Sequence, residues 1–415
     1  MNCKLSWQSI STLLALYVAI ASIYSPLKTF SYFNLTWLLA MLLWILGTFI
    51  VRPNFFINMP LQRIATVFFI VYSCLIAYLS GNSTIGNRFL NIAQIPFFYW
   101  VYQYNTMNNS HQSNYTIIKW TIPFLVITCI KTGLGLLEYP YLSRSIKTGG
   151  EESEFLWQQG IGGYELIYCI TILSIIILYL LINTYKNNKI THNLLLIIFI
   201  PIFLGVIILS NYFTALIMIV LSFFFMWVLK KREIVERMIS IIILFLLAVF
   251  NEDIIRSGIN YLIDILNPGR TLERLMSIQA NFLSGQSNLI NLIEFGDRWG
   301  TIETSLQSFC DNPILGTIIN DVSLNNELIG FGQHSQFLDT LALYGVFGVI
   351  QIYFVLQPFV IRLKGNIVLR NFSIIMLIVT IMLFTFNNVT PSVGLAIYLC
   401  FPTSYDWLQK KFIRH

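Results

Sequence analysis

Charged side chains are scarce in this 415-residue sequence, and their scarcity excludes an ordinary soluble domain. Asp, Glu, Lys and Arg make up 11% of the chain, against roughly 25% in soluble globular domains. Hydrophobic residues make up 56%, and the mean hydropathy is +0.71. Such a composition is typical of a chain surrounded largely by hydrocarbon.

Cysteine and histidine are also few, which bears on disulfides and metal sites. Of the six cysteines, only Cys310 lies in a long polar segment, so no disulfide framework can form there. None of the four histidines pairs with a cysteine at zinc-ligand spacing. We therefore expect no metal and no cofactor. The first apolar segment also lacks a small-residue cleavage site, so we expect no cleaved signal peptide.

Apolar runs recur along the whole chain, many of them long enough to cross roughly 30 Å of hydrocarbon. They predict an all-α polytopic membrane protein with about 12 transmembrane helices. The expected spans are 8–25, 33–51, 64–80, 89–104, 116–137, 163–185, 191–209, 212–229, 238–251, 335–361, 371–387 and 392–408.

The distribution of basic residues predicts the orientation of these spans, because cytoplasmic loops carry an excess of Lys and Arg. With both termini cytoplasmic, that side collects 15 of the 25 basic residues. The net charge of +6 is then explained by membrane anchoring, and nucleic acid is not an expected partner. We divide the chain into spans 1–9 (1–251), one large helical extracytoplasmic loop (252–334) and spans 10–12 (335–415).

The large loop carries the residues best suited to binding phosphate. An arginine side chain presents a planar fork of donors that fits phosphate oxygens. Arg298 stands out, because it opens an expected helix over 298–309 with Asp297 as N-cap, and a helix start favours anions. The alternative for each arginine is a salt bridge with a carboxylate nearby in sequence. The loop arginines that could clamp a pyrophosphate are Arg256, Arg270, Arg274 and Arg298.

A candidate proton acceptor ends the same loop. His334 is the only histidine on the expected extracytoplasmic side, and a neutral imidazole can take the proton of an attacking hydroxyl. The alternative is an ordinary loop histidine. Asp339 complements the start of the following helix. Glu165 and Lys131, near the outer ends of their spans, either border the same cavity or face the lipid headgroups.

Four short runs together resemble the signature of the O-antigen ligase and polymerase superfamily, which has an Arg, a downstream Pro-apolar-Leu-Gly, a His-Ser and a Gly-apolar-apolar-Gly. The runs are Gly296-Asp297-Arg298-Trp299, Asn312-Pro313-Ile314-Leu315-Gly316, His334-Ser335-Gln336-Phe337-Leu338-Asp339 and Tyr344-Gly345-Val346-Phe347-Gly348. One departure is Ser210-Asn211-Tyr212, where the family often has Ser-Arg, so a second phosphate-binding arginine would come from Arg270 or Arg274.

The resemblance implies a glycosyltransferase with the membrane-embedded C-type (GT-C) architecture in the bacterial inner membrane. It implies that Arg298 holds the pyrophosphate of an undecaprenyl-linked oligosaccharide, that His334 assists the acceptor hydroxyl, and that no metal takes part. The phrase at 332–339 is more similar to the polymerases that extend surface polysaccharides, which work with a chain-length regulator protein. Two alternatives stay open: an O-antigen ligase that transfers glycan to lipid A-core, and a flippase for lipid-linked sugars.

Overall fold

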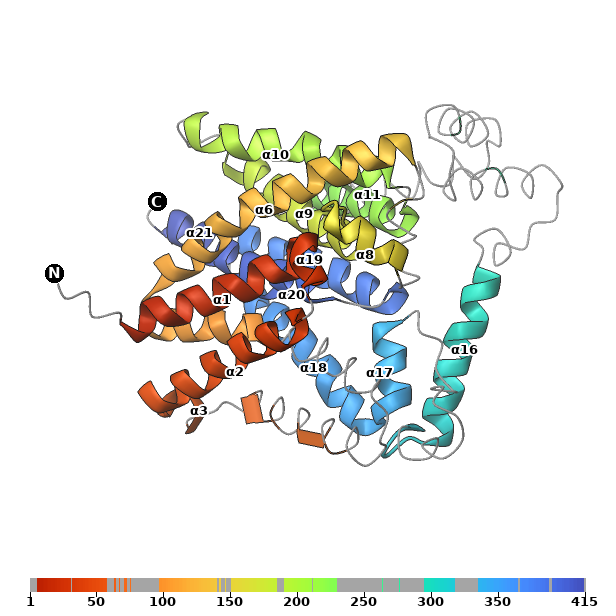
Figure 1. Cartoon of the computed structure of the whole chain (residues 1–415), viewed down its shortest axis with the longest axis horizontal. Coiled ribbons are helices and arrows are strands. Elements are labelled where there is room, and N and C mark those ends of the chain that lie inside the picture. The colour runs from red at the N-terminus through yellow and green to blue at the C-terminus, as the bar shows by residue number, and fades with distance from the viewer. Residues whose placement is uncertain are drawn as a thin grey trace.

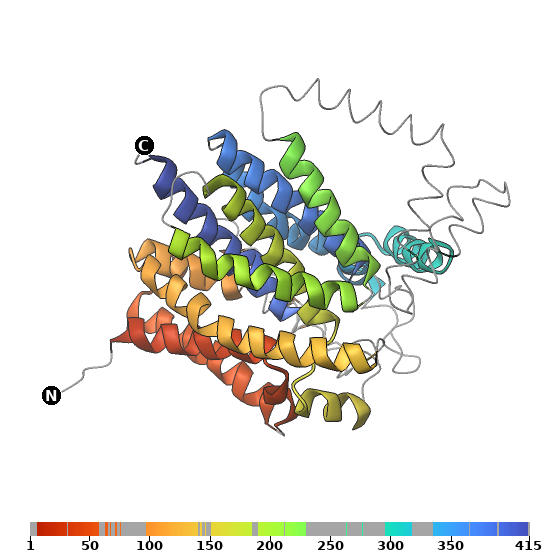
Figure 2. The ribbon, with the colours of Figure 1, turned by 90° about the horizontal axis from the view of Figure 1, so that it is seen from above.

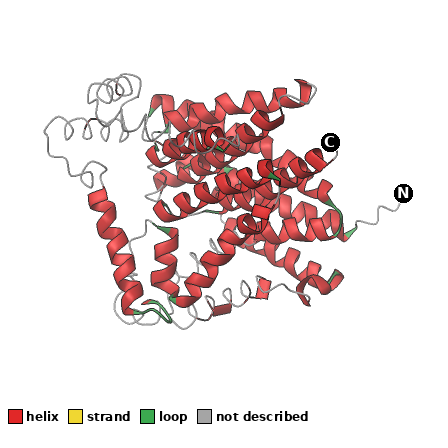
Figure 3. Cartoon of the chain, turned by 180° about the vertical axis from the view of Figure 1, so that it is seen from behind, coloured by secondary structure: helices red, strands yellow, loops and turns green. Residues whose placement is uncertain are grey.

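The computed structural model describes residues 6–30, 32–57, 97–139, 151–184, 190–210, 212–229, 295–317, 335–364, 366–387 and 390–413, with isolated residues between these ranges. The described chain is helical and contains no strand (Figure 3). The all-α expectation is therefore confirmed for this part of the chain. Arg256, Arg270, Arg274 and His334 lie outside it, and Arg298 is described only in its backbone.

The first half of the chain supplies most of the long helices. Helix α1 begins after Ser6, whose hydroxyl caps it by accepting a hydrogen bond from the Ser9 amide at 3.3 Å. Helix α2 ends at Val51 with Arg52 as its C-cap, and Pro53 follows, which cannot continue the helix. The elements are α1 (Trp7–Ile23), η1 (Ser25–Thr29), α2 (Phe33–Val51), α3 (Asn54–Ile57), a helix over 97–107, α6 (His111–Glu138), α8 (Glu151–Gln158), α9 (Tyr164–Thr184), α10 (Ile190–Leu209) and α11 (Phe213–Val228).

The remaining elements are α16 (Phe295–Asp311), α17 (Gln336–Tyr344), α18 (Val346–Val360), η4 (Ile361–Lys364), α19 (Ile367–Phe386), α20 (Pro391–Leu395), the π-turn η5 (Ala396–Cys400) and α21 (Phe401–Ile413). Asn366 caps α19 by accepting from the Val368 amide at 3.2 Å. The π-turn joins α20 and α21 into one continuous helical rod.

The long helices lie side by side in a bundle (Figures 1 and 2). Helix α1 packs on α2 and α6, α10 packs on α6 and α9, and α11 packs on α9 and α19. Small residues such as Ala15 and Ala19 of α1 are fully buried, which allows close approach between backbones. Stacked rings fill the centre, with Tyr179 and Phe372 at 4.6 Å between centroids. The core is thus a dry aromatic and aliphatic interior shared by the helices.

Four described helices are long and apolar enough to cross a membrane, which indicates a membrane protein: His111–Glu138, Tyr164–Asn183, Val346–Lys364 and Ile367–Phe386. Four shorter apolar helices accompany them: Trp7–Ile23, Leu35–Val51, Ile198–Leu209 and Thr214–Val228. The total of about twelve spans stays a prediction, because 64–80 and 238–251 lie almost wholly outside the described residues.

Two expectations about helix boundaries are wrong. The expected span 335–361 is two helices, α17 and α18, because the chain breaks at Gly345, whose φ of 56° no regular helix contains. Only the second of them continues into a segment of membrane-spanning length. Asp297 is not an N-cap, since α16 already begins at Phe295.

The two ends of the bundle differ in their polar residues. At one end, α2 and α18 finish and α6 and α19 begin. We call this the basic end, because it carries Arg52, Arg362, Lys364, Arg370, Lys410 and Lys411. At the other end, α6 finishes and α9 and α17 begin. We call this the loop end, since α16, which belongs to the expected large loop, packs on α17 there. Among the described residues, basic side chains thus gather at one end of the bundle.

A charged network fastens the helices together at the basic end. The Arg362 guanidinium donates to the Tyr102 hydroxyl at 2.9 Å and to the Pro358 carbonyl at 2.7 Å. The Tyr102 hydroxyl in turn donates to the Asp406 carboxylate at 2.7 Å, and His111 Nδ1 lies 3.9 Å from the same carboxylate. We call these four side chains the clamp. It connects helix 97–107, α6, η4 and α21.

Candidate functional site at the loop end

An ion pair marks the loop end of the bundle. Lys28 Nζ lies 2.5 Å from Glu165 Oε2, with 18% and 28% of the two side chains exposed. Lys28 belongs to η1, which Pro26 starts directly after α1, while Glu165 lies in the first turn of α9. The Lys28 ammonium also lies 5.7 Å from the ring centre of Trp157 in α8. Three separate elements therefore place one positive and one negative charge together at this end.

Polar contacts extend from this pair toward α17. The Ser392 hydroxyl donates to the Glu165 backbone carbonyl at 3.1 Å, and the Tyr168 hydroxyl donates to Asn387 Oδ1 at 2.6 Å. The backbone carbonyl of Asn387 accepts from the Gln336 amide at 3.2 Å. The start of α9, the end of α19 and the start of α17 thus meet at one place.

The N-terminus of α17 is built around Ser335. This residue is buried, has extended backbone angles, and accepts a hydrogen bond from the Leu338 amide at 3.2 Å. It is therefore a true N-cap. His334 immediately precedes it in the sequence and lies outside the described residues. Amide N–H groups of the first helical turn have no partner within the helix, so a helix start of this kind attracts anions.

Helix α16 lies across the loop end and packs on α17. It is seen along its length in Figure 1 and end-on in Figure 2, whereas the bundle helices lie in the plane of both views. The Ser305 hydroxyl of α16 donates to Asp339 Oδ1 of α17 at 2.8 Å, and both residues are buried. Asp339 is thus part of a helix–helix contact. The small serines of α16 face α17, and Leu306 is left 41% exposed.

Helices α16 and α17 run parallel, and this orientation determines toward which end of the pair the backbone of Arg298 lies. Ser305 meets Asp339 near the start of α17, while the chain just beyond α16 meets the end of α17 through Thr317, whose hydroxyl donates to the Ala342 carbonyl at 3.1 Å. Arg298 lies seven residues before Ser305, or about 10 Å along the axis. Its backbone therefore lies toward the same end of the pair as Ser335. The Arg298 side chain lies outside the described residues.

The glycines of the sequence motifs allow close backbone contact between the segment that follows α16 and the corner between α17 and α18. We call this contact, at Gly316, Gly345 and Gly348, the clasp. A Cβ on Gly316 would lie 2.2 Å from the Leu343 carbonyl oxygen, and one on Gly345 would lie 2.6 Å from the Pro313 carbonyl oxygen. One on Gly348 would lie 2.4 Å from the Thr340 carbonyl oxygen. The Val346 amide donates to the Pro313 carbonyl at 2.9 Å. Motif fragments some thirty residues apart in sequence are therefore one structural unit.

The residues expected to form the site are brought together only in part. Glu165 and Asp339 are both at the loop end, the first in an ion pair and the second bonded to α16. Lys131 of α6 lies beside the Gly160 turn, where an added Cβ would be 3.2 Å from its Nζ. No group of three or more His, Cys, Asp and Glu side chains suited to a metal occurs within the described ranges.

Sequence reasoning missed Lys28, Tyr168 and Asn387 at this end. A signal for Lys28 exists, because it is a lone lysine between two apolar spans on the side that otherwise has few basic residues. Tyr168 and Asn387 gave no signal, since a single polar residue near the end of an apolar segment is common. Their pairing across 219 positions appears only in the folded chain.

Comparisons with known proteins do not assign this chain to a family. A scan against protein-family models found no match, and searches of curated proteins and of solved structures found none either.

Proposed function

We propose that this protein is a membrane glycosyltransferase that polymerises a surface polysaccharide. In this proposal it transfers a growing glycan from undecaprenyl pyrophosphate to a lipid-linked repeat unit, on the extracytoplasmic face of the bacterial inner membrane. The observation that carries the proposal is the parallel packing of α16 on α17. It puts the backbone of Arg298 and the residue next to His334 toward the same end of one helix pair.

The chemistry assigned to these residues requires an anion site next to a proton acceptor. The bond between the anomeric carbon of the glycan and the phosphate oxygen breaks, and undecaprenyl pyrophosphate leaves. A new bond forms between that carbon and the acceptor hydroxyl oxygen, whose proton passes to His334. Arg298 and the N–H groups at the start of α17 stabilise the negative charge that develops on the leaving pyrophosphate.

Two further features support an enzyme rather than a transporter. Transporters usually place charged residues near the middle of their spans. Here the four candidate spans hold at most two charged residues in any 18-residue core window, and the charged pair Lys28–Glu165 lies at the loop end. Helix α16, which lies crosswise to the bundle and has Leu306 exposed, also suits a helix at headgroup depth.

Complementation of a strain that lacks its own copy tests the proposal. We expect Arg298→Ala and His334→Ala to abolish long-chain ladders on a gel, leaving lipid A-core capped with a single repeat unit. Arg370→Ala is a matched control, since it removes an exposed basic side chain at the opposite end of the bundle. Protein levels are compared by immunoblot.

Other gel patterns would contradict the assignment in distinct ways. Long-chain ladders of normal intensity from both variants would refute the roles of Arg298 and His334. Polymer that accumulates on its lipid carrier in the deletion strain would identify a ligase. Repeat units retained inside the cell would identify a flippase.

A further inference from the structure

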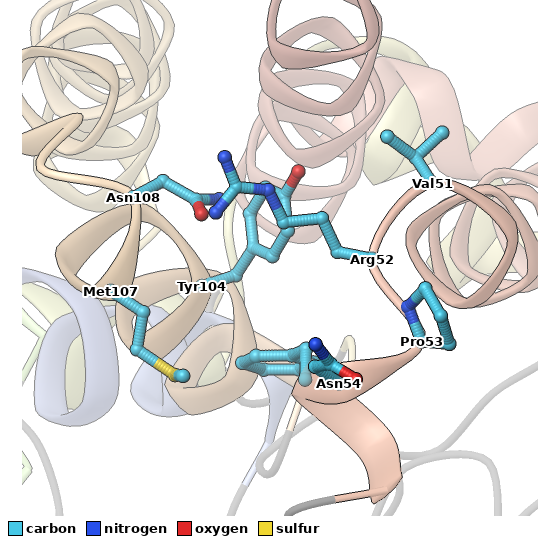
Figure 4. A pocket seen from close by; sticks show the side chains of 8 residues that line it. Val51, Arg52, Pro53, Asn54, Tyr104, Met107 and Asn108 are labelled. Atoms are coloured by element: carbon cyan, nitrogen blue, oxygen red, sulfur yellow. The ribbon is translucent and has the colours of Figure 1, made fainter.

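A pocket of about 330 Å³ opens at the basic end, far from the candidate site. It lies between the corner that joins α2 to α3 and the last turn of helix 97–107 (Figure 4). Pro53 ends α2 at this corner, and the Phe55 amide closes the turn on the Arg52 carbonyl at 3.0 Å. The corner therefore presents the Arg52 side chain to the pocket.

The walls of the pocket carry positive charge and no negative charge. Arg52 is the one ionised side chain among the residues that line it, and none of them is Asp or Glu. No carboxylate of the described chain lies within 4 Å of its guanidinium. An exposed arginine without a counter-ion leaves the pocket suited to an anion.

A second arginine lies directly behind the pocket wall. Arg63 is buried, donates to the Phe55 carbonyl, and places its guanidinium 4.1 Å from the Phe55 ring centre. Its other terminal nitrogen lies 3.5 Å from the Met107 sulfur. Phe55 and Met107 both line the pocket. Within the described residues Arg63 also has no ion pair, so two uncompensated positive charges adjoin the same space.

Hydrogen-bond donors gather around Tyr104 in and beside the pocket. The Tyr104 hydroxyl has the Arg52 guanidinium, the Asn108 amide and the Trp7 indole around it, all three of them donors. Figure 4 shows the Arg52 guanidinium between the Asn108 amide and the Tyr104 hydroxyl.

The rim of the pocket is apolar on the side of α2. Val51 and Met107 at its mouth are exposed, and Ile50 beside them is 78% exposed. The exposed face of α2 continues from there through Phe49 and Leu46. A ligand that fits both the basic pocket and the apolar face of α2 has a compact anionic oxygen group joined to a hydrocarbon chain.

We propose that this pocket binds the phosphate group of an anionic membrane phospholipid. The Arg52 guanidinium donates two hydrogen bonds to the phosphate oxygens, and the acyl chains lie along the exposed face of α2. Basic pockets at the ends of transmembrane helices are suited to anionic headgroups. Such a lipid would bridge the α2–α3 corner and helix 97–107 and so stabilise their contact.

Native mass spectrometry of the full-length protein in detergent tests this site, with phosphatidylglycerol and phosphatidylcholine added at equal concentration. We expect the wild-type protein to retain phosphatidylglycerol preferentially. Arg52→Ala should weaken that retention about tenfold, since a charge-assisted bidentate contact is lost. Arg370→Ala removes an equal charge from an exposed position at the same end and should change nothing.

Three outcomes would overturn the proposal. Equal retention of both lipids by the wild type would remove the anion selectivity. Equal losses in Arg52→Ala and Arg370→Ala would reduce the effect to general attraction by positive charge. Displacement of the lipid by glycerol 3-phosphate at the same concentration would show a site for soluble phosphate. Circular dichroism confirms that Arg52→Ala is folded, and the pocket can fail this test while the glycosyltransferase assignment stands.

Discussion

At the scale of single residues, the glycines of the motif runs are explained by backbone contacts. Gly316 and Gly345 have φ angles of 77° and 56°, and each lies against the main chain of the other's segment. The sequence predicted that these runs belong together, but it gave no reason for the glycines. The reason requires three dimensions, because the close approach joins residues of α17 to residues beyond α16.

Replacing Gly345 with alanine should therefore destabilise the protein. A side chain at this φ is strained, and its Cβ would collide with the Pro313 carbonyl, for a cost of about 1–3 kcal/mol. Thermal unfolding in detergent measures the effect as a lower midpoint. Gly205→Ala is the control, since Gly205 lies within helix α10 and nothing lies within 4 Å of a Cβ there. Equal midpoints for the two variants would contradict the clasp.

At the scale of elements, the sequence located most helices well but not their breaks. Hydropathy detects a run of apolar residues, and α6, α9 and α19 follow the expected runs closely. It does not detect a reversal at one glycine, so α17 and α18 were expected as a single span. It also could not show that α16 and α17 run parallel, because that depends on which faces pack.

The docking of α16 on α17 should depend on the small side chain at position 305. Ser305→Leu places a larger side chain in a buried contact and removes the hydrogen bond to Asp339, at a cost of about 1–3 kcal/mol. Hydrogen exchange of amides 302–311 should become faster. Gln307→Leu adds the same side chain at an exposed position of α16 and should leave exchange unchanged. Unchanged exchange in Ser305→Leu would mean that α16 is held elsewhere.

At the scale of the whole molecule, the clamp joins segments from distant parts of the sequence. Arg362 contacts Tyr102 across 260 positions, and Tyr102 contacts Asp406 across 304. Charge asymmetry in the sequence predicts that Arg362 lies with the other basic residues on one side of the membrane. Its partners could not be predicted, because many polar residues lie at the same end and only packing selects among them.

Arg362→Ala should loosen the bundle as a unit. It removes donors to Tyr102 and Pro358 and leaves the Asp406 carboxylate with less positive charge around it, for a loss of about 2 kcal/mol. The thermal midpoint in detergent should fall. Lys364→Ala, on the same turn and exposed, should have little effect. If the two variants unfolded at the same temperature, the clamp would contribute nothing to stability.

The clamp also has a consequence for the order of assembly. Tyr102 is made early, whereas the Asp406 carboxylate that accepts its hydrogen bond is synthesised 304 residues later. Until α20 and α21 are synthesised, helix 97–107 and η4 lack the Asp406 side chain, which completes the hydrogen-bonded network of the clamp. We therefore expect the helices to insert one after another and the clamp to form only after α20 and α21 have been synthesised. A chain that stalls before that point should lack these hydrogen bonds between helices.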